Sequence, residues 1–131
     1  VRVVGPLREY TQIELAMTDA FLLGLDSIPT RLSGDIAGSQ PITLVGPKGS
    51  LTLSEGAIRA ARHVHMTPQD AEKYRVKNGD RVRIETRGRN GVIFKDVIVR
   101  VSDKSKLAFH IDTDEANAAN IKGLTFSRIL Y

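Results

Sequence analysis

The chain has 131 residues, of which 41% are hydrophobic and 26% charged, and its formal net charge is +4. This composition is typical of a soluble globular protein, and no run approaches the roughly 20 apolar residues that a membrane-spanning helix needs. The chain contains no cysteine, so any metal site must use imidazole and carboxylate ligands. Basic and acidic residues alternate and aromatic residues make up only 5%, which argues against a nucleic-acid partner.

The first half of the chain predicts short strands separated by glycine-bearing turns. The first of these strands is apolar and ends at Gly5-Pro6, and the second alternates between apolar and polar residues. A short helix is expected at residues 20–24. The expected strands span residues 1–4, 11–17, 41–45, 51–53 and 57–64.

The second half predicts two strand-to-helix junctions. A helix at 68–74 should begin after Thr67, a good N-cap, with Pro68 in its first turn. Another short helix should open at residues 112–115, and the tail at 120–131 is either a closing strand or a partner contact. The strands expected in this half span residues 81–86, 92–101 and 106–111.

These elements predict a mainly β fold, a small β-barrel or sandwich with two or three short helices. We expect two parts. Residues 1–62 would supply barrel strands with Arg8 and Glu14, and residues 63–131 would form a second barrel portion that carries all three histidines.

The three histidines are the residues that point most directly to chemistry. His63 and His65 are two apart in an expected strand, so both imidazoles should point to one face and could bind one metal ion. His110 ends another expected strand, again just before a helix. The alternative interpretation is that these histidines are ordinary core or surface residues.

Several separated strings, in the same order, resemble the phosphate propanoyltransferase family, the phosphotransacylases of bacterial propanediol-utilisation microcompartments and their relatives. The likeness extends from the first residue to about Ala119. The strings are G-P-L-R with T-Q-I-E, T-D-A-F, I-T-L-V-G-P-K-G-S, A-R-H-V-H-M and H-I-D-T-D-E-A-N-A-A.

The resemblance implies a metal-dependent phosphate acyltransferase that converts acyl-CoA, propanoyl or acetyl, and phosphate reversibly to acyl phosphate and CoA. It also implies a two-barrel architecture and two zinc ions. The residues that it assigns are Glu14, His63, His65 and His110 as metal ligands, Arg8 at phosphate, and Arg2 and Asn117 at CoA. A planar guanidinium suits that role for Arg8, because it binds two phosphate oxygens at once.

The sequence departs from the family in one respect, since it lacks the earlier His-x-His string that supplies the other metal. We therefore expect that an upstream segment is missing, that this chain fully ligates at most one zinc, and that it need not be active alone. A homodimer or association with that segment stays open, and the resemblance implies the bacterial cytoplasm or the microcompartment lumen. Two other functions stay open, a zinc-dependent thioester hydrolase and a noncatalytic β-barrel module that binds nucleotides.

Overall fold

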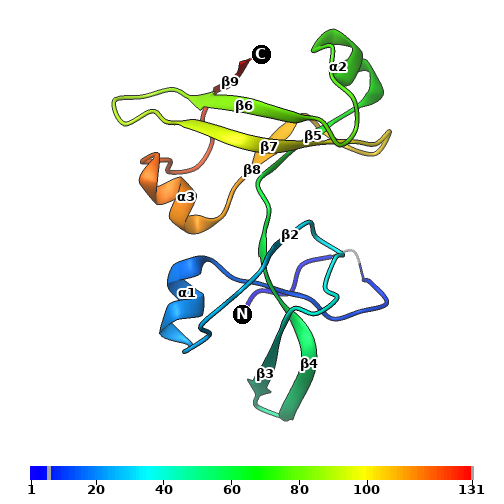
Figure 1. The fold of residues 1–131 in the computed structure, drawn as a ribbon, viewed down its shortest axis with the longest axis vertical. Helices are drawn as coiled ribbons and strands as arrows, with labels where there is room; N and C mark the ends of the chain where they lie inside the picture. The colour runs from blue at the N-terminus through cyan, green and yellow to red at the C-terminus, as the bar shows by residue number, and fades with distance from the viewer. Residues whose placement is uncertain (6, 131) are drawn as a thin grey trace. The chain divides into compact units, whose positions relative to one another are not determined.

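The computed structural model describes residues 1–5 and 7–130 and divides the chain into two compact units, Val1–Ala60 and Ala61–Tyr131 (Figure 1). The prediction of a mainly β chain with two or three short helices is confirmed. Pro6, in the expected Gly5-Pro6 turn, and Tyr131, at the end of the tail, lie outside the described residues. Within the described part, no helix combines the length and apolarity needed to cross a bilayer.

The first unit is built around one long strand, β4, which pairs with the three other strands of the unit. The pairing with β3 is antiparallel, whereas the pairings with β1 and β2 are parallel and two residues long. Ala20, Ile28 and Ala57 form its small buried core. The elements are β1 (Ile13–Glu14), α1 (Met17–Leu22), β2 (Thr30–Arg31), β3 (Gln40–Gly46) and β4 (Gly49–Ala60).

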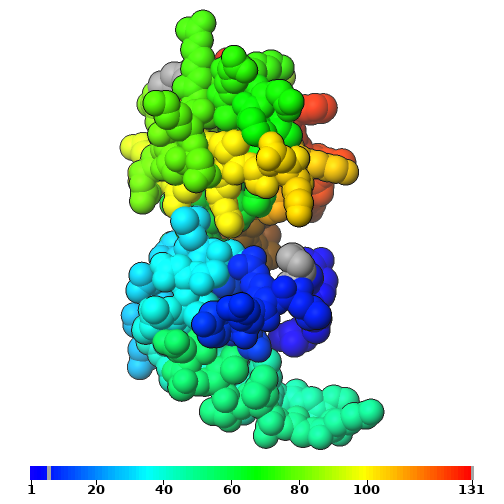
Figure 2. Space-filling model, turned by 90° about the vertical axis from the view of Figure 1, so that its right-hand side faces the viewer, coloured from blue at the N-terminus to red at the C-terminus, as the bar shows by residue number. Residues whose placement is uncertain are grey.

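The β3–β4 hairpin extends beyond that core. Its tip stands clear of the rest of the first unit in Figure 2, where it is coloured teal to green. Val45 is 84% exposed and Leu51 48% exposed, so both apolar side chains face solvent here. The hydroxyls of Thr43 and Thr52 lie 3.0 Å apart across the two strands and hold their register. The hairpin is therefore stabilised by its own pairing more than by burial.

The second unit is a five-stranded sheet in the order β8-β5-β7-β6-β9, which curves around an apolar core (Figure 1). Alternate residues of its strands face that core, including Val64, Met66, Ile84 and Val99. Burial of these apolar side chains stabilises this unit. The elements are β5 (His63–Met66), α2 (Pro68–Lys73), β6 (Arg81–Thr86), β7 (Ile93–Val101), β8 (Ala108–His110), α3 (Thr113–Ala118) and β9 (Ser127–Leu130).

Several expected elements of the sequence are wrong in type or extent. Residues 1–4 form no strand, and Val1, Val3 and Val4 are exposed, because no other described strand pairs with them. Of residues 11–17 only β1 is a strand, and Met17 begins α1 instead of continuing it. The single strand expected at 57–64 is two strands, because β4 ends at Ala60 and β5 begins at His63.

The tail has a clear role in the second unit. β9 pairs antiparallel with β6 over four residues, from Arg83 opposite Leu130 to Thr86 opposite Ser127. Arg128 donates two hydrogen bonds to Glu85 across this pair, at 2.7 and 3.1 Å. Of the two alternatives for residues 120–131, the closing strand is therefore correct.

Candidate metal centre

The strand β5 presents two imidazoles on the face of its sheet opposite the core. Val64 and Met66 are buried in the core, so the alternation of strand side chains directs His63 and His65 to the other face. His63 is itself buried at 8% exposure, and His65 is half-buried. The prediction that both imidazoles share one face is confirmed.

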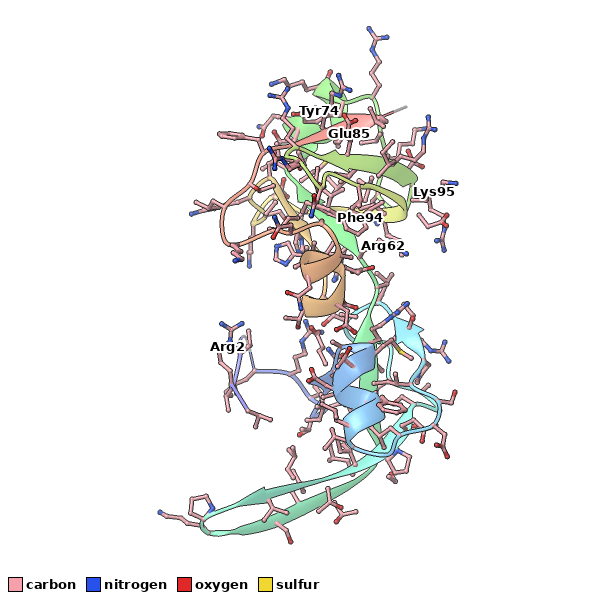
Figure 3. All side chains as sticks on the ribbon, turned by 90° about the vertical axis from the view of Figure 1, so that its left-hand side faces the viewer. Arg2, Arg62, Tyr74, Glu85, Phe94 and Lys95 are labelled. Carbon is pink, nitrogen blue, oxygen red and sulfur yellow. The ribbon has the colours of Figure 1, made fainter. Side chains whose placement is uncertain are left out.

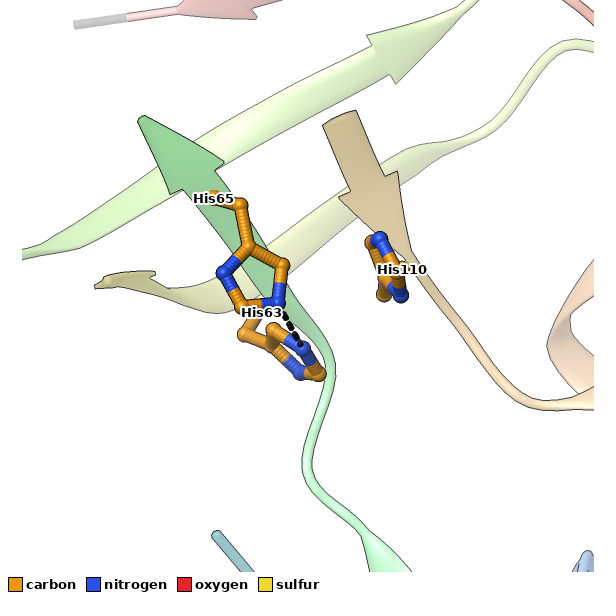
Figure 4. A group of neighbouring side chains, drawn as sticks. All are labelled: His63, His65 and His110. Carbon is orange, nitrogen blue, oxygen red and sulfur yellow. Dashed lines mark hydrogen bonds between the residues drawn. The ribbon is translucent and has the colours of Figure 1, made fainter. Parts of the chain in front are cut away.

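The edge strand β8 brings the third histidine to the same place. It pairs antiparallel with β5, and His110 lies directly opposite His63 in the register. The ring centroids of the three histidines are 4.8 to 5.1 Å apart, and one nitrogen of each ring lies within 4.8 Å of the others (Figure 4). These three side chains could therefore hold one metal ion between them.

A backbone hydrogen bond indicates which tautomer the neutral ring of His63 adopts. Its Nδ1 lies 2.8 Å from the carbonyl oxygen of Ala61, which only accepts, so Nδ1 carries the proton and donates it. In the neutral ring, Nε2 of His63 is then an acceptor, and it lies in hydrogen-bond contact 3.2 Å from Nε2 of His65. A backbone carbonyl that fixes the tautomer in this way is a common partner of metal-binding histidines.

The electrostatic environment favours neutral imidazole at this site. The pKa of His65 lies below its ordinary value, first because burial disfavours the charged form, then because of the neighbouring His63 and His110, and lastly because of Arg100. Arg100 is the register partner of His65 on β7. Since a metal competes with protons for imidazole nitrogen, a lowered pKa makes the lone pair available near neutral pH.

Each histidine-bearing strand is followed by a capped helix, as the sequence predicts. The Thr67 side chain accepts a hydrogen bond from the Asp70 N–H, and Asp70 bonds back to the Thr67 N–H, so a capping box starts α2. Asp112 and Glu115 form the same arrangement at the start of α3. The chain is thus fixed just beyond both His65 and His110.

The other predicted site residues lie on different elements. Glu14, Arg8 and Arg2 belong to the first unit and are exposed, whereas Asn117 lies on α3 and is also exposed. Their roles at metal, phosphate and CoA stay predictions.

A glutamine that the sequence reasoning missed links Glu14 to the backbone next to Arg8. Gln12 Nε2 donates to Glu14 at 2.7 Å, and Gln12 Oε1 accepts from the Gly34 N–H, also at 2.7 Å. Gly34 in turn lies beneath the Arg8 guanidinium, since an added Cβ would be 3.2 Å from Arg8 Nη1. Arg8, Glu9, Tyr10, Gln12, Gly34 and Ile36 line one pocket. The T-Q-I-E string is the signal that could have identified Gln12.

Fold and site together define a mainly β protein with a three-imidazole centre of the kind that binds divalent metals in enzymes. The family model for phosphate propanoyltransferase matches residues 1–122. The chain belongs to this family, and the resemblance read from the sequence is confirmed.

Curated relatives agree with this assignment. A phosphate propanoyltransferase of Priestia megaterium is 55% identical over 92% of this chain and 55% of its own length. Those of Lachnoclostridium phytofermentans and Thermotoga maritima are each 50% identical, over 92% and 91% of this chain and 56% and 57% of their own lengths. The chain thus spans a little more than half the length of the relatives it matches.

Proposed function

We propose that the full-length protein transfers an acyl group reversibly between CoA and inorganic phosphate. One observation carries the proposal: a chain of the phosphate propanoyltransferase family brings three imidazole nitrogens within 4.8 Å of one another. Relatives about half identical to this chain are named for that activity. Acyl-CoA and phosphate are accordingly the proposed substrates, and the bacterial cytoplasm or a microcompartment is the proposed location.

Zinc is the proposed metal, and the spacing of one pair of ring nitrogens fits it. Two nitrogens bound to tetrahedral zinc at ~2.0 to 2.1 Å lie about 3.3 Å apart. Nε2 of His63 and Nε2 of His65 are 3.2 Å apart. His110 supplies a third donor, and Glu14 is the carboxylate proposed from the family resemblance. A zinc ion bound there supplies Lewis acidity toward a carbonyl oxygen.

The remaining assigned residues bind and orient the two substrates in this proposal. Arg8 holds phosphate through its planar guanidinium, and its exposed position beside a pocket suits that task. Arg2 and Asn117 contact CoA. Holding both reactants in place replaces a bimolecular encounter with a positioned attack.

Direct transfer to phosphate is the step that this proposal contains. A phosphate oxygen attacks the thioester carbonyl carbon, a C–O bond forms, and the C–S bond breaks so that CoA leaves as a thiolate that takes up a proton. This chain has no cysteine, so it offers no thiolate to carry the acyl group as a covalent intermediate.

The test is an assay of the full-length protein with acyl-CoA in the presence and absence of phosphate. We expect acyl phosphate and free CoA only when phosphate is present. Release of CoA at an equal rate without phosphate would indicate a thioester hydrolase instead, and no turnover of acetyl- or propanoyl-CoA would indicate a binding module. The variant His65→Ala should lose metal uptake and acyl phosphate formation together.

A further inference from the structure

One ion pair joins the two segments that carry the histidines. Arg62 directly precedes His63, and Glu115 lies on α3, five residues after His110. Arg62 Nε is 3.3 Å from Glu115 Oε1, and their side chains are only 31% and 16% exposed. In contrast, the pair between Arg128 and Glu85 is 62% and 34% exposed. The Arg62–Glu115 pair, the inner pair, is therefore the better shielded of the two from solvent and salt.

The carboxylate of Glu115 also belongs to the capping box of α3. Its Oε2 accepts from the Asp112 N–H at 3.1 Å, while Asp112 Oδ1 accepts from the Glu115 N–H at 2.8 Å. One side chain therefore fixes the backbone two residues beyond His110 and, through its other oxygen, contacts Arg62. The position of α3 is in this way tied to the start of β5.

A second contact of Arg62 leads back to the same edge strand. The Arg62 guanidinium lies 5.8 Å from the centre of the Phe94 ring, beside which Figure 3 shows it. The ring centroid of Phe94 in turn lies 5.6 Å from that of Phe109, the residue before His110. Arg62 thus contacts both the carboxylate of Glu115 and the ring of Phe94, which packs on β8.

The edge strand needs such support, because β8 is three residues long and pairs only with β5 among the described strands. A short edge strand on its own is weakly held. We propose that Arg62 and Glu115 are positioning residues, which hold His110 against His63 and His65 so that the three imidazoles meet at one metal. This inference rests on the proposed function for the metal itself.

The test compares two substitutions of equal chemistry in the full-length protein. Glu115→Gln removes the charge that faces Arg62 but keeps an amide oxygen able to complete the capping box. Glu85→Gln does the same to the pair with Arg128, away from the histidines, and is the matched control. Arg62→Lys retains the positive charge and should restore part of what Arg62→Gln loses.

The readouts are Zn²⁺ affinity by chelator competition and the visible absorption of bound Co²⁺, which reports the number and geometry of nitrogen ligands. We expect Glu115→Gln and Arg62→Gln to weaken Zn²⁺ binding by up to about 10-fold, the lower end of the loss seen when a direct hydrogen-bond partner of a ligand is removed, and to change the Co²⁺ spectrum. Glu85→Gln should leave both unchanged. In the metal-free protein, NMR contacts between the rings of His63 and His110 should weaken in Glu115→Gln and Arg62→Gln but not in Glu85→Gln.

Unchanged affinity, spectrum and ring contacts in Glu115→Gln and Arg62→Gln would overturn the positioning role and leave the metal site intact. Equal losses in Glu85→Gln would also overturn it, because the effect would then be one of general stability. If the unsubstituted protein bound neither metal at these histidines, the proposed metal site would fail first, and the inference with it.

Discussion

Zinc should stabilise the unit Ala61–Tyr131 against unfolding, and His65→Ala should remove that effect. A ligand that binds only the folded state adds RT ln(1 + [L]/Kd), which is about 2.7 kcal/mol when zinc is at 100 times its Kd. For a domain of roughly 60 to 100 residues, each kcal/mol raises Tm by about 4 to 8 °C. We therefore expect zinc to raise the Tm of this unit by about 10 to 20 °C.

The position of His65 makes this substitution a clean test. The side chain lies on the sheet face opposite the core, so its removal opens no cavity among the buried residues. The assay is calorimetric or circular-dichroism melting of the full-length protein with excess chelator and with a zinc buffer. Lys95→Ala, an exposed truncation on β7, is the control and should keep the full zinc-dependent rise. An equal rise in His65→Ala, or none in the unsubstituted protein, would refute the assignment of the three imidazoles as a metal site.

Three further predictions follow from particular contacts. Arg8→Lys should raise the phosphate KM much more than the acyl-CoA KM, because the planar fork is lost, and steady-state kinetics with the opposite order would count against that role. Arg100→Gln should raise the pKa of His65 in the metal-free protein, as measured by NMR titration; an unchanged or lower pKa would contradict Arg100, the register partner of His65, as one cause of the shift besides burial and the neighbouring histidines. The pKa of His65 in the folded protein lies below its unfolded value near 6.5, so protonation of this ring destabilises the folded state. This destabilisation is complete at pH values below the folded pKa and disappears as pH rises through the unfolded value. The free energy of unfolding should therefore rise over this pH range, and Arg100→Gln should make the rise smaller. Thr86→Val should cost about 1 to 3 kcal/mol in urea unfolding, because the Val92 N–H loses its hydroxyl acceptor, and a neutral result would show that water replaces it.

The parts of the site that could be predicted from sequence are those set by local rules. The His-x-His pair on one strand face depends only on a period of two, and Thr67 as a helix N-cap depends only on neighbouring residues. The family assignment likewise needed only short strings in the right order. Each of these features depends only on residues that are close together in the sequence.

What the sequence did not predict depends on pairing between distant segments. That His110 lies opposite His63 follows from the register of β8 on β5, which no local pattern specifies. The contact of Arg62 with Glu115 joins residues that are far apart in the sequence, so no helical or strand repeat predicts it. Residues 1–4 show the converse, since this apolar run with strand propensity forms no strand, and none of the strands that the structure describes pairs with it.

The most direct test of the central claim is an anomalous-difference map, recorded at the zinc absorption edge, from crystals of the zinc-loaded full-length protein. We predict a peak bonded to Nε2 of both His63 and His65 and to a ring nitrogen of His110, with nitrogen distances of ~2.0 to 2.1 Å. Zinc bound elsewhere, with the rings of His63 and His65 still hydrogen-bonded to each other as they are here, would contradict it.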